Sequence, residues 1–355
     1  MAERLAYRPS RAREGRPATK VLITGATGFV GCHTAAALAR AGHELNLLVR
    51  SRERVRPALE PLGVGEVEVA TGDVTDAAAV EAALRGCDAV VHCASVYSLD
   101  RRAGAEMKRT NVRGTDTVLG AAHRLGLDPI VHVSSVAALI GERGATLGPD
   151  SGPGMPRTVY SRSKADSEQV ARRYQDAGAP VVITYPSAVF GPHDPHAGEQ
   201  CRIADAVLRD YWRFAPPGSI WISDVRDVAR LHAAVMERGR GPRRYIALTH
   251  NLSLNELLGA VGGVTGRAFR TTRVPLWSLE YPLLLADALQ LLLPFRLPLN
   301  HESVYIGALN HRVDDSATRR ELGLEPRDLK ETLADALRWM VDAGHLSRKL
   351  VGALA

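Results

Sequence analysis

The sequence predicts an α/β protein with a Rossmann-type doubly wound parallel sheet and a smaller, mostly helical C-terminal substrate lobe. Three observations indicate this fold. Short apolar runs alternate with helical stretches between residues 20 and 185. A glycine-rich turn, residues 24–31, follows the first apolar run directly. Several of the runs are continuously apolar, which is typical of strands that are covered on both faces.

The first half of the chain follows a strand–helix rhythm. The predicted strands are residues 20–24, 44–49, 67–70, 88–94, 129–135 and 180–185. The predicted helices are residues 29–41, 76–84, 103–125 and 159–177, with a Gly/Pro-rich loop over 141–156. Strands that alternate with helices form βαβ units and a parallel sheet. We therefore expect a dinucleotide-binding Rossmann domain over residues 19–190.

The rhythm changes after Pro186, where helical patterns dominate. The predicted helices are about 199–213, 226–238, 254–262, 276–293 and 328–343, and one strand-like run covers 244–248. Ser253 followed by Glu256 is typical of a capping box at a helix start. The apolar-rich stretch 283–295 is too short to span a membrane, so we interpret it as a buried helix. We expect a substrate-binding lobe over residues 191–355 that shares strands with the first domain.

Composition and charge exclude several classes of protein. The chain has 355 residues, 45% of them hydrophobic and 24% charged, which excludes collagen-like, coiled-coil and wholly disordered chains. Much of the net charge of +6 lies in the first 20 residues, where six basic residues face two acidic ones. We interpret residues 1–18 as a disordered basic tail, a solvated leader rather than a nucleic-acid arm, and it has no apolar core of a secretory signal.

Cysteine usage bounds the compartment and the metal chemistry. The four cysteines form no Cys-x-x-Cys pair and no metal-ligand spacing. We therefore expect reduced thiols, a cytoplasmic protein and no metal site.

The glycine-rich turn is the first chemical signal. Gly25, Gly28 and Gly31 would serve a tight turn, a close approach of backbone to pyrophosphate, and close packing of helix on strand. The helix that follows would offer its positive end to the phosphates. The candidate cofactor-binding residues of this turn are Gly25, Thr27, Gly28, Phe29, Val30 and Gly31.

The end of the second strand bears on the choice of nucleotide. An acidic residue there would accept hydrogen bonds from the adenosine ribose and favour NAD. This chain has Arg50 and Ser51 instead, and a guanidinium at Arg50 can pair with a 2′-phosphate. NADP(H) is favoured and NAD(H) remains open. Asp73 and Val74 follow the third strand, where a carboxylate can meet the adenine amino group.

The second chemical signal is Tyr160 with Lys164 four residues later, which places both side chains on one helix face. Reduction of a carbonyl by hydride needs a proton for the nascent alkoxide, and a phenol can supply it. A free tyrosine has a pKa of ~10, and a neighbouring ammonium lowers it. A hydroxyl should also polarise the carbonyl, and we choose Ser135 at a strand end, with Ser134 as the alternative.

Further candidates surround this pair. Asn111 falls inside a predicted helix, where asparagine is unfavourable, which indicates a local kink or a water site. The candidate substrate-pocket residues are Val96, Tyr97, Ser135, His193, Tyr211, Trp212 and Phe214. Aromatic residues at helical spacing are core more often than pocket, so a packing role stays open for the last three.

In combination these motifs resemble the extended short-chain dehydrogenase/reductase family, also known as the NAD-dependent epimerase/dehydratase family. The resemblance covers about residues 20–343 and is nearest to the dihydroflavonol reductase and 3β-hydroxysteroid dehydrogenase branches. It rests on TGATGFVG (24–31), GDVTD (72–76), HCAS (92–95), NVRGT (111–115), SS (134–135), YSRSK (160–164) and PSAVFGP (186–192). Asp227-Val228-Ala229 also resembles the start of a family helix near the substrate.

The resemblance implies a catalytic set and a cofactor cradle. Ser135, Tyr160 and Lys164 would be catalytic, and Asn111 would support a proton-relay water. Lys164 would also hold the nicotinamide ribose. The further residues implied at the cofactor are Ala94, Pro186, Ser187 and Val189. The resemblance also implies a homodimer formed through the helices 103–125 and 159–177.

Two departures from the family pattern bear on the reaction. Tyr185 stands where many members have arginine, which we interpret as the loss of an anion contact used by nucleotide-sugar epimerases. Val136-Ala137-Ala138 follows Ser135 in place of the Asp-Glu pair of the sugar dehydratases. We expect an NADP-dependent oxidoreductase that interconverts a ketone or aldehyde and an alcohol on a fairly apolar small molecule.

Two alternatives stay open. One is a nucleotide-sugar epimerase with tightly bound NAD(P), which would need basic groups for a diphosphate, such as Arg202, Arg209 and Arg213. The other is a non-catalytic protein that senses dinucleotides. We expect no nucleic-acid partner and no membrane span.

Overall fold

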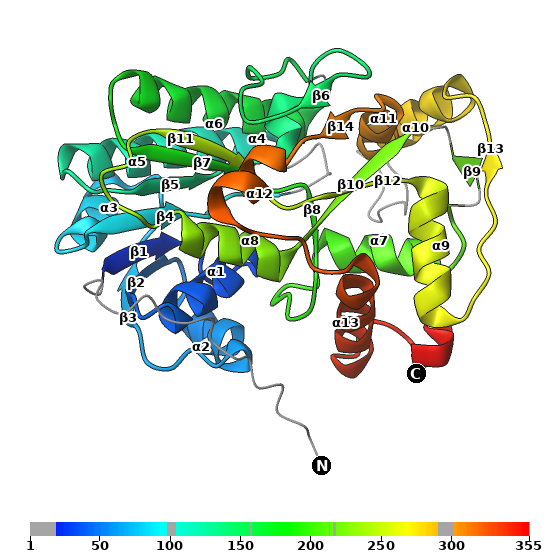
Figure 1. Cartoon of the computed structure of the whole chain (residues 1–355), viewed down its shortest axis with the longest axis horizontal. Helices are drawn as coiled ribbons and strands as arrows, with labels where there is room; N and C mark the ends of the chain where they lie inside the picture. The colour runs from blue at the N-terminus through cyan, green and yellow to red at the C-terminus, as the bar shows by residue number, and fades with distance from the viewer. Residues whose placement is uncertain are drawn as a thin grey trace.

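A seven-stranded, wholly parallel sheet forms the centre of the computed structural model (Figure 1). The structure describes residues 19–97, 104–156, 158–212, 214–215, 218–289 and 301–354. The strand order is β11-β7-β5-β4-β1-β2-β3, so the chain starts near the middle and winds outward in both directions. The strands are β1 (Lys20–Thr24), β2 (Glu44–Val49), β3 (Glu68–Thr71), β4 (Ala89–His92), β5 (Ile130–Val133), β7 (Val181–Tyr185) and β11 (Arg243–Ile246).

The burial of the strands explains why they read as continuously apolar. Every residue of β4, β5 and β7 is buried, whereas β3 at the sheet edge is half-buried or exposed throughout. Figure 1 shows two layers of helices, one on each face of the sheet. The bounds of these helices are α1 (Phe29–Arg40), α2 (Val55–Leu59) and α8 (Val225–Ala234) on one face, and α3 (Ala77–Leu84), α5 (Gly114–Arg124) and α6 (Val159–Asp176) on the other.

The helix ends follow local chemistry that is readable in the sequence. Asp76 caps α3, because its carboxylate accepts hydrogen bonds from the backbone N–H groups of Ala78 and Ala79. Gly42, Gly126 and Gly178 follow the ends of α1, α5 and α6, each with a φ between 74° and 86°. A residue with a side chain is strained in this left-handed conformation, so glycine ends these helices readily.

The helix predicted over 103–125 is not α-helical throughout. Among the described residues it consists of α4 (Gly104–Met107), a π-helical segment (Lys108–Arg113) and α5. Asn111, where we expected a local kink or a water site, lies inside the π-helical segment. Such π-bulges occur frequently at functional sites.

The second half contains more strands than its sequence pattern indicates. A three-stranded sheet joins β8 (Ala188–Phe190), β10 (Ser219–Asp224) and β12 (His250–Ser253). Strand β8 precedes residue 191, the expected start of the second part of the chain, whereas β11, which follows that residue, belongs to the main sheet. Two small sheets join β9 (Phe214–Ala215) to β13 (Thr272–Arg273) and β6 (Thr146–Leu147) to β14 (Arg312–Val313).

The helices of this half differ from prediction at several ends. Their bounds are α7 (Glu199–Leu208), α9 (Leu254–Thr265), α10 (Trp277–Leu289), α11 (His301–Ala308), α12 (Ser316–Leu322) and α13 (Leu329–Asp342), with short 3₁₀ turns at 348–350 and 352–354. Further 3₁₀ turns lie in the first half at 52–54, 60–62 and 136–139. Ser253 and Glu256 form the expected capping box at α9. The helix expected over 199–213 ends at Leu208, and α11 and α12 were not predicted.

The interpretation of residues 283–295 as a buried helix is wrong for the part the structure describes. Leu284 and Leu285 in α10 keep 39% and 63% of their surfaces exposed. An apolar composition favours burial of a helix, but whether the helix is buried depends on what packs against it. Residues 290–295 lie outside the described residues. None of the described helices combines the length and the apolar character that crossing a membrane requires.

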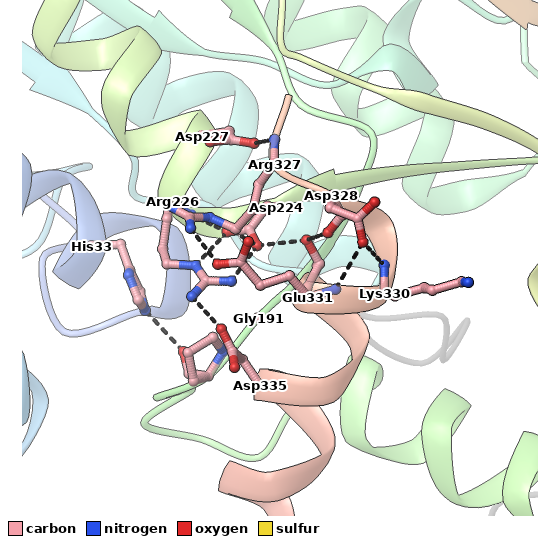
Figure 2. A network of polar contacts seen from close by, with 12 residues as sticks. His33, Gly191, Asp224, Arg226, Asp227, Arg327, Asp328, Lys330, Glu331 and Asp335 are labelled. Atoms are coloured by element: carbon pink, nitrogen blue, oxygen red, sulfur yellow. Dashed lines mark hydrogen bonds and ion pairs between the residues drawn. The ribbon is translucent and has the colours of Figure 1, made fainter. Parts of the chain in front are cut away.

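A network of charged groups fastens the last long helix, α13, to α8 (Figure 2). Asp224 caps α8 and accepts two hydrogen bonds from the guanidinium of Arg226, and it also accepts one from Thr332 of α13 at 2.7 Å. Arg226 reaches α13 itself through Asp335 at 2.6 Å. Because α8 packs on α1, this network holds the second half of the chain against the helix that follows the glycine turn.

Candidate active site

The glycine turn lies between β1 and α1 and has no room for side chains. A Cβ at Gly31 would lie 2.1 Å from the carbonyl oxygen of Gly25, and one at Gly25 would lie 2.6 Å from the backbone nitrogen of Ala94. Gly25 also has a φ of 73°, in the left-handed region that favours glycine. Thr27 and Gly28 complete the turn. The structure therefore brings the predicted turn residues and Ala94 together.

The start of α1 has the character of an anion site. Gly28 is its N-cap and makes no side-chain capping bond, and the first turn contains no acidic residue. Phe29, Val30 and Gly31 begin the helix, whose first N–H groups have no partner within the helix. Uncapped N–H groups and a bare glycine backbone fit the pyrophosphate of a dinucleotide.

The residues expected at the adenosine end lie after β2 and β3. Arg50 is exposed directly after β2, and Ser51 donates its hydroxyl hydrogen bond to Glu53. The carboxylate of Asp73 accepts hydrogen bonds from the hydroxyl and backbone nitrogen of Thr75, at 2.6 and 2.9 Å, which lowers the pKa of Asp73. Val74 is buried against Gly114. The charge of Arg50 acts on Asp73, so both belong to one corner of the molecule.

Tyr160 and Lys164 share one face of α6, as their spacing predicts. Tyr160 is half-buried at the first turn, and the ring of Tyr97 packs edge-on against it with centroids 4.7 Å apart. Lys164 is buried, with 6% of its surface exposed. Burial lowers the pKa of Lys164 to about 8, while the charges of Cys93 and Glu168 act in the opposite direction.

Two buried histidines lie beneath this pair, and we did not predict a role for them. His92 ends β4 and its neighbour on β5 is His132, and their rings stack with centroids 5.7 Å apart. His92 shares a hydrogen bond with Thr24 through Nδ1 at 2.7 Å. Burial lowers the pKa of His92 to about 3 and that of His132 well below its ordinary value, and the charge of Lys164 adds to both effects.

Ser135 follows β5 and caps a short helical turn. Its Oγ accepts a hydrogen bond from the backbone nitrogen of Ala137 at 3.1 Å and donates to the carbonyl oxygen of Pro186 at 3.4 Å. Ser134 is buried, and its Oγ has no partner among the described residues. Ser135 is the more accessible of the two hydroxyls and remains our candidate for contact with a carbonyl.

Asn111 joins three parts of the site. Its Oδ1 accepts from the hydroxyl of Ser95 and the backbone nitrogen of Val96, and its Nδ2 donates to the carbonyl of Val96 and to Ser163 of α6. These four bonds use the whole capacity of an amide side chain. The side chain thus holds the loop after β4 against α6, and a relay water at this residue would have to use the backbone carbonyl.

The segment after β7 leads from the sheet into the second lobe. Pro186 accepts the hydrogen bond from Ser135, and Ser187 shares one with Ser223 at 2.8 Å. Val189 packs against the core on the α1 side of the sheet. This segment starts beside Ser135, which is where the resemblance places a border of the nicotinamide.

The structure separates the candidate pocket residues into two groups. Val96 and Tyr97 lie beside Asn111 and Tyr160. His193 instead has its ring 6.2 Å from that of Trp339 on α13. Trp212 packs against a hydrophobic cluster formed by residues of the second half of the chain, such as Leu208, Leu257 and Leu337. Tyr211 keeps 49% of its surface exposed. The side chain of Phe214 lies outside the described residues.

The structure overturns our interpretation of Tyr185. Tyr185 is fully buried, and its hydroxyl donates a 2.6 Å hydrogen bond to Glu168 of α6. Arg172 pairs with the same carboxylate at 2.7 Å. The side chain at position 185 therefore points into the layer of α6, where it cannot meet an anionic group of a substrate. Glu168 and Arg172 were visible in the sequence one and two helical turns after Lys164, a signal that we missed.

Comparison with known proteins agrees with this geometry. The model of the NAD dependent epimerase/dehydratase family matches residues 21–247. The chain belongs to the NAD-dependent epimerase/dehydratase family. It is an NAD(P)-dependent oxidoreductase of the extended short-chain type that acts on small molecules, and the resemblance stated from the motifs is confirmed.

Individual relatives cover nearly the whole chain. "Sterol demethylase protein B" of Methylococcus capsulatus is 30% identical over 331 residues, which cover 91% of this chain and 98% of the relative. A Synechocystis sp. protein named after dihydroflavonol 4-reductase is 32% identical over 339 residues, with 91% and 95% covered. A dTDP-glucose 4,6-dehydratase from Streptomyces venezuelae, solved with NAD bound, shares the fold at a TM-score of 0.71 and 24% identity, with 93% and 99% covered.

No group of three or more His, Cys, Asp or Glu side chains within the described residues is arranged to hold a metal ion.

Proposed function

We propose that this protein is an NADPH-dependent reductase that converts a ketone or aldehyde on a fairly apolar small molecule to the alcohol. The observation that carries the proposal is the buried Lys164 one turn from Tyr160, on a helix beside the carboxyl ends of β4 and β5. In open α/β sheets ligands bind at this end of the strands. The relatives named for a sterol and for a dihydroflavonol reductase support an apolar ring compound as substrate.

The chain's own residues have separate tasks in this reaction. A bound dinucleotide supplies the hydride. Ser135 donates a hydrogen bond to the substrate carbonyl and orients it. Tyr160 gives its phenolic proton to the oxygen as the alkoxide forms, and the ammonium of Lys164 stabilises the phenolate that is left. Tyr97 packs against Tyr160 and presents an apolar surface beside it.

Two observations favour reduction over the other reactions of the family. Val136, Ala137 and Ala138 are buried apolar residues at the place where dehydratases carry an acid and a base. Arg202 and Arg209, the candidates for holding a sugar diphosphate, are paired with Glu199 at 2.6 Å and Asp205 at 2.8 Å on their own helix. Arg213 lies outside the described residues.

The choice between reductase and epimerase is tested by how the dinucleotide behaves. We expect the purified protein to carry little bound dinucleotide and to oxidise free NADPH when steroid, flavonoid or aliphatic ketones are added. An epimerase would retain its dinucleotide through purification and would leave added NADPH unchanged while it converts a nucleotide sugar. That second result would overturn the proposed reaction.

Arg50 provides a prediction about the cofactor. In the variant Arg50→Glu a carboxylate would repel the 2′-phosphate and accept hydrogen bonds from the ribose, so the preference should change from NADPH to NADH. Titration of both dinucleotides into both proteins measures the change. Arg52→Glu, two residues further along, is the matched control because it makes the same charge change after the strand end. Equal affinities of the unaltered protein for both dinucleotides would contradict the role of Arg50.

The outer face of α6 provides a prediction about assembly. A surface hollow of about 560 Å³ lies beside α6, lined by residues of α6 that include Gln169 and Arg172, by Val112 and by Pro153. We propose that α5 and α6 of two copies pair and brace Tyr160. Sedimentation at micromolar concentration should then show a dimer, and Gln169→Arg, on the exposed part of α6, should weaken it. A single species of the monomer mass, 38.3 kDa, would contradict this proposal.

A further inference from the structure

The inward face of α6 carries four polar side chains at a regular interval. Tyr160, Lys164, Glu168 and Arg172 follow one another every four residues, so each lies about one turn, ~6 Å along the helix axis, from the next. Lys164 and Glu168 are buried, with 6% and 0% of their surfaces exposed. The reaction proposed above uses Tyr160 and Lys164 and leaves Glu168 and Arg172 without a task.

Glu168 is held in place by two donors from different elements. Its Oε1 accepts from Arg172 at 2.7 Å and from the hydroxyl of Tyr185 at 2.6 Å. Arg172 is itself fixed, because it also donates to the carbonyl oxygen of Ser151 at 2.7 Å and contacts the hydroxyl of Tyr185 at 3.1 Å. The other carboxylate oxygen of Glu168, Oε2, is buried with no partner among the described residues. The protein thus keeps a buried carboxylate that its immediate neighbours satisfy only on one oxygen.

Lys164 needs a nearby negative charge. A buried ammonium loses its hydration, which favours the neutral amine. The groups that face it from the sheet are His92, Cys93 and His132, and burial keeps the two histidines neutral at neutral pH. Burial also raises the pKa of the Cys93 thiol to about 12, so this group carries no charge near neutrality either. Among the groups whose charges act on Lys164, Glu168 is then the anion.

We propose that Glu168, clamped by Arg172 and Tyr185, is a positioning residue whose carboxylate keeps Lys164 charged inside the protein. Arg172 lies two turns from Lys164, ~12 Å along the helix, whereas Glu168 lies one turn away. The charge of Glu168 is among those that act most on Lys164, and the charge of Arg172 is not. Tyr185 connects this clamp to Pro186, at the start of the segment that would border the nicotinamide. The inference rests on the proposed function for the role of Lys164 in the reaction. Its test does not depend on that function, because it follows only the protonation of Lys164.

The test reads the protonation of Lys164 directly. The chain has only five lysines, Lys20, Lys108, Lys164, Lys330 and Lys349, so ¹³C-labelled lysine gives five side-chain NMR signals to follow against pH. The signal of Lys164 is assigned as the one that is missing from the spectrum of the variant Lys164→Arg. In Glu168→Gln, which keeps the shape and removes the charge, we expect the pKa of Lys164 to fall by about one pH unit. An unchanged pKa of Lys164 in folded Glu168→Gln would overturn the proposal.

Two control variants separate charge from packing. Tyr185→Phe removes one hydrogen bond but keeps the carboxylate, so the pKa of Lys164 should stay close to that of the unaltered protein. Glu68→Gln removes the carboxylate beside the half-exposed Lys20, where water screens the pair, and should shift Lys20 less than Glu168→Gln shifts Lys164. A fall in Tyr185→Phe as large as that in Glu168→Gln would assign the effect to packing and contradict the proposal.

A double variant keeps the proposal testable if the single variant does not fold. If Glu168→Gln does not fold, Glu168→Gln/Arg172→Met replaces the whole buried ion pair by neutral groups of similar volume, a change that buried pairs often tolerate. The same fall in the pKa of Lys164 is expected there. In an active enzyme, the alkaline limb of kcat/KM should move to lower pH in Glu168→Gln and return in Glu168→Asp. Absence of any turnover would contradict the proposed function, while the NMR result would still decide the role of Glu168.

Discussion

The variant Tyr160→Phe is expected to lose a factor of ~10²–10⁴ in turnover, the usual contribution of a general acid. The phenol is the proton donor in the account above, and phenylalanine keeps its ring against Tyr97. Dinucleotide affinity should change little, because the glycine turn, the start of α1 and Lys164 remain. Steady-state rates with NADPH and an accepted ketone, together with a binding titration, measure both quantities.

Tyr174→Phe is the matched control for this experiment. Tyr174 lies on the same helix, and its hydroxyl donates to Asp116 of α5 at 3.0 Å. We expect this variant to keep nearly full turnover. A value of kcat for Tyr160→Phe within about threefold of the unaltered enzyme would remove Tyr160 from the catalytic role.

The variant Gly31→Ala is expected to abolish dinucleotide binding at working concentrations. The added Cβ would lie 2.1 Å from the carbonyl oxygen of Gly25, so the turn that receives the pyrophosphate must move. A loss of at least about 100-fold in affinity is expected, which corresponds to ~2.8 kcal/mol. Calorimetric titration with NADPH measures the loss.

Gly259→Ala makes the same change where it should do no harm. Gly259 is an exposed residue inside α9, and a Cβ there would meet nothing within 4 Å. Because alanine favours a helix more than glycine does, stability should rise by ~0.5–1 kcal/mol. Binding of NADPH by Gly31→Ala with the affinity of the unaltered protein would contradict the placement of the pyrophosphate.

The parts of the fold that could be predicted are those that local chemistry determines. Continuously apolar runs revealed β4, β5 and β7, because both faces of these strands are covered. The strands β8 and β12 were missed since they are short and mostly half-buried or exposed. The strand β10 was also missed, although its last four residues are buried, and the pairing of these three strands joins segments distant in the chain. The helices α11 and α12 carry weak periodicity, and their positions depend on what packs against them.

The site shows the same division. Spacing alone placed Tyr160 and Lys164 together, because four residues make one helical turn. The stacking of His92 on His132 could not be predicted, since it depends on which strands are neighbours. The interpretation of Tyr185 failed because a residue type was compared with a family pattern without knowing which way its side chain points. The structure turns it toward Glu168, at a hydrogen-bond distance of 2.6 Å.

In the proposed reaction, hydride passes from free NADPH to the carbonyl carbon of the substrate. The most direct measurement uses NADPH that carries deuterium at the transferable position of the nicotinamide, with mass spectrometry of the product. We expect one deuterium on the carbinol carbon for each NADPH oxidised. Product that contains no deuterium, formed while the dinucleotide stays bound and unchanged in amount, would contradict the proposed reaction and would assign the protein an internal oxidation and reduction instead.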